Sequence, residues 1–149
     1  HCESSAASDV YKRQRLTKPP FNLIEYDVRL KSTNLDKENQ CTASIKLSIN
    51  EIEIEKNAIG NGPVAALDKA LREALLKFYP SLDKVKLTDY KVRVVNESEA
   101  TESIVRVSIE SADDKEVWTT VGASSNIIEA SWMALSDSME WWLIKNIID

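Results

Sequence analysis

Few residues of this sequence carry the side chains that nucleophilic, acid–base or metal-assisted catalysis requires. The chain of 149 residues has one histidine, His1, and two cysteines, Cys2 and Cys41. His1 lies in a leader that we exclude from the fold, which removes Ser-His-Asp and Cys-His nucleophile schemes and histidine metal sites. No Cys-x-x-Cys pair is present either. We therefore expect no catalytic residue, no metal and no cofactor in this chain.

The carboxylates are plentiful, but they do not form an acid–base pattern. Glu51, Glu53 and Glu55 alternate along one expected strand, which is typical of a solvated strand face. Residues 60–63, Gly-Asn-Gly-Pro, resemble a phosphate loop superficially. They lack the Gly-Lys-Ser/Thr that holds phosphate groups.

Residues 60–67 form the most specific local feature, and two interpretations of it stay open. In the first, they are a strand-to-helix turn in which glycine supplies unusual backbone angles. In the second, they form a carboxylate-binding helix start, because unsatisfied N–H groups and the helix dipole attract an anion. Residues 122–127, Gly-Ala-Ser-Ser-Asn-Ile, occupy the same place in the second half of the chain. Two such starts with short side chains leave room for a small ligand.

The aromatic residues offer further candidates. Tyr90 is expected on the inward face of a strand, beside Val92 and Val94. There it is either a core tyrosine or the wall of an apolar pocket whose hydroxyl holds a polar group. Trp141 and Trp142 favour packing or a dimer contact over a membrane belt, since no apolar run approaches the roughly 20 residues that cross a bilayer.

The elements that must position these residues come from an internal repeat. Residues 23–30 match 87–94, 44–49 match 104–109, and 58–60 match 120–122, in the same order and about 60 to 64 residues apart. Each copy shows three alternating segments typical of half-buried strands, followed by a helical pattern. The sequence therefore predicts an α+β fold with a duplicated β3α unit, β-β-β-α-β-β-β-α, and helices packed on antiparallel sheet. The expected units are about residues 22–80 and 86–148.

Both helices have recognisable ends. Asn61 is expected to cap the first helix, Pro63 fits its first position, and Pro80 stops it. In the second helix, Asn126 is the expected cap, and Glu129 three residues later completes a capping-box pattern. The apolar stripes comprise Val64, Leu67, Leu71, Ala74, Leu75 and Phe78 in the first helix, and Ile128, Trp132, Leu135, Met139 and Trp142 in the second.

Composition narrows the class of protein. Hydrophobic content of 43% and charged content of 29% are typical of a soluble globular domain, and 149 residues suffice for one core. The net charge of −5 argues against nucleic acid, because phosphate binding needs a basic face. Two cysteines, one at an expected strand edge, predict no disulfide framework and favour a reducing cytoplasm. The sequence shows no secretory signal and no membrane partner.

Residues 1–20 are polar and show no periodicity. We interpret them as a linker or an added leader and assign residues 21–149 to the domain. Pro19 and Pro20 would form a stiff connection to something upstream, so the chain is expected to be a piece of a longer protein.

Several long runs closely resemble the carboxy-terminal regulatory domain of citramalate synthases. They are residues 60–72 with 78–82, residues 87–94, and residues 121–132, and the likeness covers about residues 21–145. The 2-isopropylmalate synthases share a looser version. The run Asn-Ile-Ile-Glu-Ala-Ser-Trp at 126–132 points to the citramalate branch.

The resemblance implies a function. Family members carry an upstream metal-dependent TIM-barrel domain that condenses acetyl-CoA with a 2-oxo acid, pyruvate in citramalate synthase. Their carboxy-terminal domain forms a homodimer and binds the end product of the pathway, which inhibits the enzyme. The resemblance thus implies an isoleucine-binding regulatory domain with no catalysis of its own.

The family pattern also implies where the ligand lies, near the helix starts at the dimer interface. Ala65 departs from it, because the family often has Asp or Asn there. Recognition of the ligand's ammonium group is therefore expected to fall to Asn126 or to backbone carbonyls. The implied ligand-binding residues are Val64, Ala65, Leu87, Tyr90, Val94, Thr101, Val105, Ser124, Ser125 and Asn126.

Three rivals to isoleucine sensing stay open. The nearest is a leucine-binding domain of a 2-isopropylmalate synthase, since methyl placement distinguishes the two ligands by only about 1–3 kcal/mol. The second is a purely structural dimerisation module. The third, an independent enzyme, would need turnover of acetyl-CoA by this chain alone.

Overall fold

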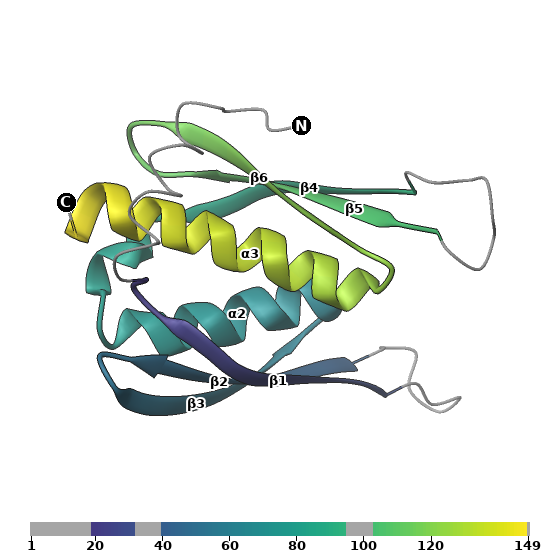
Figure 1. Ribbon diagram of the computed structural model, residues 1–149, viewed down its shortest axis with the longest axis horizontal. Coiled ribbons are helices and arrows are strands. Elements are labelled where there is room, and N and C mark those ends of the chain that lie inside the picture. The colour runs from purple at the N-terminus through teal and green to yellow at the C-terminus, as the bar shows by residue number, and fades with distance from the viewer. Residues whose placement is uncertain (1–18, 32–39, 95–102, 149) are drawn as a thin grey trace. The chain divides into compact units, whose positions relative to one another are not determined.

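A computed structural model describes residues 19–31, 40–94 and 103–148. The chain divides into two compact units, a first unit of Pro20–Leu82 and a second unit whose described residues are Pro19 and those from Asp83 onward. Each unit contains a three-stranded antiparallel sheet and a helix (Figure 1). The predicted α+β fold with a duplicated β3α unit is confirmed.

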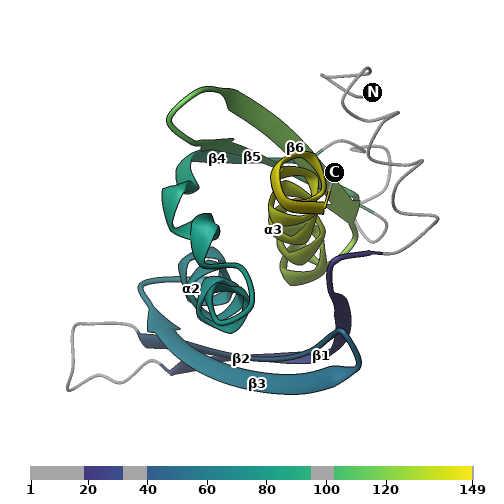
Figure 2. The same ribbon diagram turned by 90° about the vertical axis from the view of Figure 1, so that its left-hand side faces the viewer.

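The first unit has the strand order β1-β2-β3, with β2 in the centre. Along β2 every second side chain is buried, as its alternating sequence predicts. The helix α2 packs chiefly on β2 and β3 (Figure 2). The elements are β1 (Asn22–Lys31), β2 (Gln40–Ile49), β3 (Ile52–Gly60), α2 (Pro63–Leu76) and the short η1 (Pro80–Lys84).

The second unit repeats this arrangement in the order β4-β5-β6, with β5 in the centre. Its helix α3 packs chiefly on β5 and β6. The elements are β4 (Lys86–Val94), β5 (Val105–Ala112), β6 (Val117–Ser124), α3 (Ile127–Leu143) and η2 (Ile144–Ile148).

The strand register fixes how the two units correspond. Tyr26 lies opposite Ile45, and Tyr90 lies opposite Ile109, each 64 positions further along the chain. The sequence match of 44–49 with 104–109 was therefore wrong by four residues, and that of 58–60 with 120–122 by two. Both errors are even numbers, which leave inward and outward positions unchanged, so alternation alone could not detect them.

The edge strands β1 and β4 are less buried than their sequence predicted. The side chains of Tyr90 and Val94 are on the same sheet face as the buried Ile109 and Val107, yet they are 47% and 49% exposed. A helix is about 10 Å wide and strands lie about 4.8 Å apart, so one helix covers only about two strands. The inward direction of Tyr90 is confirmed, and its exposure within its own unit contradicts the first of its two interpretations, a core tyrosine.

Cys41 lies at the beginning of a strand, as predicted. That strand is the central β2, and the cysteine is fully buried and free. Burial raises the pKa of the Cys41 thiol, which keeps the group in its unreactive protonated form.

Each helix begins close to its predicted position, and one of the two predicted N-cap residues is confirmed. Gly62, not Asn61, is the N-cap of α2, with no side-chain cap hydrogen bond, and Pro63 opens the helix as predicted. Asn126 is confirmed as the N-cap of α3. The expected capping box is replaced, because the Asn126 amide donates to Ser124 Oγ at 3.1 Å rather than to Glu129.

The end of α2 differs slightly from the prediction, whereas the predicted buried faces of both helices largely agree with the structure. Helix α2 ends at Leu76, so Phe78 lies beyond it rather than in its stripe. Most predicted stripe positions are buried, and Val64, Leu67 and Leu71 form the packed face of α2. The predicted face of α3 is buried likewise at Trp132, Leu135, Met139 and Trp142.

Candidate ligand-binding site

Three of the implied ligand-binding residues lie in one row across the second sheet. Val94 pairs with Val105, and Val105 pairs with Ser124. All three are on the face that carries α3, at the end of the sheet where that helix begins. Ser125 and Asn126 follow directly. The structure therefore brings five of the implied residues to one corner of the second unit.

The remaining residues of β4 lie further away. At about 3.3 Å per residue, Tyr90 is roughly 13 Å from Val94, and Leu87 is on the order of 20 Å away. Leu87 pairs with Ser111, near the opposite end of the strand. Within one copy of this sheet, an amino acid in contact with Ser124 cannot also contact Leu87.

The start of α3 already has acceptors from its own chain. Asn126 Oδ1 accepts a hydrogen bond from the Ile128 amide at 2.8 Å, and the Ala130 amide donates to the Asn126 carbonyl. The Asn126 side chain therefore occupies the place that a ligand carboxylate would take at this helix start.

The start of α2, in the first unit, is different. Its first helical hydrogen bond runs from the Ala66 amide to the Gly62 carbonyl at 3.0 Å, and no side chain caps it. The amides of Val64 and Ala65 precede this bond. The Val64 side chain is buried, while Ala65 is exposed, so this start can offer backbone N–H groups to an anion.

Both helix starts depend on glycines at a close approach of strand and helix. A Cβ on Gly60 would lie 2.6 Å from the Ala66 nitrogen, and a Cβ on Gly122 would collide with the Ala130 carbonyl oxygen. The two glycines do not correspond in register, because Gly60 matches Ser124. Each helix therefore touches its third strand at a different point.

One titratable group near the start of α2 was missed by sequence reasoning. Burial raises the pKa of Asp68, against the opposing effect of Arg72, whose Nη2 lies 3.5 Å from Asp68 Oδ1. Arg72 Nη1 also donates to the Leu82 carbonyl at 3.4 Å. The sequence does contain a signal for Asp68, because an aspartate next to the apolar stripe of a helix is placed close to the buried face.

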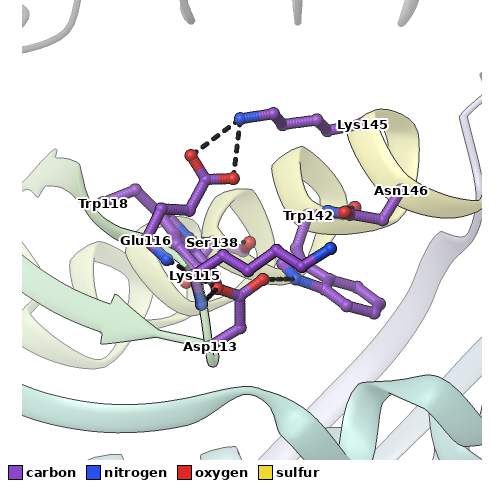
Figure 3. A network of polar contacts seen from close by, with 8 residues as sticks. All are labelled: Asp113, Lys115, Glu116, Trp118, Ser138, Trp142, Lys145 and Asn146. Atoms are coloured by element: carbon purple, nitrogen blue, oxygen red, sulfur yellow. Dashed lines mark hydrogen bonds and ion pairs between the residues drawn. The ribbon is translucent and has the colours of Figure 1, made fainter.

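A second polar cluster joins the β5–β6 hairpin to the end of α3 (Figure 3). Asp113 accepts a hydrogen bond from Trp142 Nε1 at 2.8 Å, and this bond is the main cause that lowers the pKa of Asp113. Lys145 Nζ lies 2.6 Å from Glu116 Oε1 and 4.9 Å from the centre of the Trp141 ring. The cluster packs both tryptophans within the second unit, in agreement with their predicted packing role.

Some predictions fall outside the described residues. Thr101, His1 and Cys2 are among them. Within the described part of the chain, no group of three His, Cys, Asp or Glu side chains could hold a metal ion. In the same part, no helix is both long and apolar enough to cross a membrane.

The pattern of two β3α units with these motifs has known counterparts. The LeuA allosteric (dimerisation) domain family matches residues 5–143. The chain belongs to this family. The match confirms the predicted regulatory domain and extends over both units of this LeuA-type domain.

Curated relatives agree with the citramalate branch. An (R)-citramalate synthase of Aquifex aeolicus is 47% identical over 131 residues, which are 88% of this chain and 25% of that protein. An (R)-citramalate synthase of Geobacter sulfurreducens is 46% identical over 126 residues, 85% of this chain and 24% of that protein. A 2-isopropylmalate synthase of Shewanella sediminis is 32% identical over 98 residues, 66% of this chain and 17% of that protein. The LeuA-type domain thus spans about a quarter of the length of the two citramalate synthases.

Proposed function

We propose that this LeuA-type domain binds isoleucine and thereby inhibits a citramalate synthase of which it is the regulatory part. The catalytic domain would lie upstream and condense acetyl-CoA with pyruvate. The proposal includes a homodimer, a cytoplasmic location and no cofactor in this domain. Its main support is the apolar, helix-facing side of β4, which α3 leaves uncovered.

The chemistry of that surface suits a dimer interface with a ligand in it. Tyr90, Val92 and Val94 are each more than 40% exposed on one strand, and contiguous apolar surface of this kind marks a binding area. In a twofold dimer, residue i of one copy meets residue j of the other. Leu87 of one copy can then approach Ser124 of the other, which one sheet alone does not allow.

The carboxylate and the ammonium group of the ligand need polar partners in addition to the apolar surface of β4. The uncapped amides of Val64 and Ala65 supply donors for the carboxylate. The ammonium group needs an acceptor, and Ala65 offers no carboxylate. We assign that role to Asn126 or to backbone carbonyl oxygens, which accept without a counter-charge.

Calorimetry with isoleucine, leucine and valine tests the proposal on the whole chain. We expect isoleucine to bind most tightly and Tyr90→Ala to weaken binding about tenfold, a loss of 1.4 kcal/mol. The dimer, measured by light scattering, should survive the change. Lys91→Ala, on the opposite face of β4, is the matched control and should leave the affinity unchanged.

The rivals give different results in the same experiment. Tighter binding of leucine would support the leucine-binding domain of a 2-isopropylmalate synthase. A dimer without heat or thermal shift from any branched-chain amino acid would support the purely structural module. Unchanged affinity in Tyr90→Ala would remove Tyr90 from the site.

A further inference from the structure

The motif at residues 78–82, Phe-Tyr-Pro-Ser-Leu, has no part in the proposed ligand site, yet it has a defined contact. The Tyr79 hydroxyl donates a hydrogen bond to the Pro20 carbonyl at 3.0 Å, across 59 positions of sequence. Pro20 and Phe21 are buried, although they lie at the start of the first unit. This bond ties the beginning of the unit to the chain just after α2.

The position of Tyr79 is fixed by the helix. Its amide donates to the Leu75 carbonyl at 2.8 Å, and its carbonyl accepts from the Leu82 amide at 3.0 Å. Leu75 and Leu82 are fully buried. Since the backbone is held on both sides, the hydroxyl moves with the end of α2 rather than independently.

The bond also has a stable donor and a stiff acceptor. Burial raises the pKa of the Tyr79 hydroxyl above its ordinary value, so the proton is present at neutral pH. Pro20 follows Pro19, and two prolines in succession leave little torsional freedom. A shift at the Pro20 carbonyl is therefore passed along the chain instead of being absorbed locally.

Helix α2 connects two places that matter for regulation. Its start carries the uncapped amides assigned above to the ligand carboxylate, and its other end carries Tyr79. Its 14 residues give it a length of about 21 Å, and its buried face holds it on β2 and β3 as one body. A small displacement at the start is thus reproduced at the far end.

We propose that Tyr79 is a positioning residue that couples ligand binding at the start of α2 to the segment through which the chain enters the first unit. This inference rests on the proposed function, because it needs an amino acid bound at that helix start. The segment at Pro19 and Pro20 then senses occupancy of the site through one hydrogen bond.

Hydrogen exchange of the whole chain, with and without saturating isoleucine, tests the coupling. Without ligand, Tyr79→Phe keeps the ring but loses the bond, and the amides of Phe21, Asn22 and Leu23 should exchange about three- to tenfold faster. In the wild type, isoleucine should slow these amides at least about threefold. In Tyr79→Phe this response should be lost, while calorimetry shows an affinity within about threefold of wild type.

Ser81→Ala, an exposed neighbour in the same turn, is the matched control and should behave as wild type. Isoleucine binding without an effect on these three amides, or an equal effect in Tyr79→Phe, overturns the coupling and leaves the proposed function intact. No binding of isoleucine to the wild type overturns both proposals together.

Discussion

The two units share one topology but stabilise it differently. In the first unit, Leu47 lies opposite Ile54 in the β2–β3 pair. At the corresponding place in the second unit, Ser111 lies opposite Trp118. Ser111 Oγ and Ser138 Oγ are 2.6 Å apart, and Trp118 Nε1 donates to Ser138 Oγ at 3.1 Å.

The hairpin turns of the two units also differ in the interactions that stabilise them. Asn50 and Glu51 form a two-residue turn with φ of 51° and 68°, the left-handed geometry that matches strand twist. In the second unit, Asp113 Oδ1 accepts from the amides of Lys115 and Glu116, both at 2.8 Å. At these two corresponding places, the first unit therefore depends on apolar packing and backbone conformation, and the second on side-chain hydrogen bonds.

The largest effect is expected where a helix touches its third strand. Gly122→Ala would place a methyl group against the Ala130 carbonyl oxygen and Met133. Backbone must move, so we expect a loss of about 3 kcal/mol in the free energy of unfolding, and about 1–3 kcal/mol for Gly60→Ala. Urea unfolding measures both. Gly62→Ala, with open space around the new Cβ, should cost less than about 1 kcal/mol; equal losses at all three positions would contradict the close approach.

The buried hydroxyl pair gives the next effect. Ser138→Ala leaves Ser111 Oγ without this partner in the core, which should cost about 1–3 kcal/mol of unfolding free energy. The double change Ser111→Ala and Ser138→Ala removes both groups, and it should cost less than the sum of the two single changes. Additive losses in the urea series would show that the two hydroxyls do not interact.

The two perturbed aspartates should respond to pH in opposite directions. The pKa of Asp113 is lowered in the folded state, so its stabilising effect is complete well above the ordinary pKa of about 3.9 and is lost as pH falls through the lower folded value. The pKa of Asp68 is raised, so acidification toward about 3.9 should increase wild-type stability relative to Asp68→Asn. Thermal melts of wild type, Asp113→Asn and Asp68→Asn between about pH 7 and 3 test this, and parallel pH profiles would refute the assignment.

The smallest effect is expected at the surface of the polar cluster. Lys145→Ala removes the ion pair with Glu116 and the contact over Trp141, but the lysine side chain is 47% exposed. The loss should be under about 1 kcal/mol and should shrink in high salt. Lys145→Arg keeps both contacts and serves as the control, so a larger loss there than in Lys145→Ala would be inconsistent with the pair.

Local patterns allowed the order of the elements and the inward faces to be predicted. The cap at Asn126, the opening at Pro63 and the direction of Tyr90 follow from short-range chemistry that a single segment contains. The exact residue-by-residue correspondence of the two units could not be predicted in this way, because a shift by an even number of residues preserves the alternation of inward and outward side chains. The exposure of β4 and the Ser111–Ser138 contact depend on which strands one helix covers, and that is decided by packing between distant segments.

The candidate site was predictable only in part for the same reason. Val94, Val105 and Ser124 meet through strand register, which alternation predicts approximately. Tyr79 and Asp113 owe their roles to partners that lie 59 and 29 positions away. Contacts across such separations produce no periodic pattern in the sequence, so they could not be predicted from it.

One shared irregularity has a consequence for association between chains. Both β1 and β4 shift register at the same place, after Leu23 and after Leu87, and the extra residues there are Ile24 and Thr88. An extra residue bends an outer strand and spoils its line of backbone donors and acceptors as a template for foreign strands. Each bulge therefore makes its outer strand a poorer template for the addition of further strands, and deletion of Thr88 should straighten β4 and increase aggregation measured by light scattering.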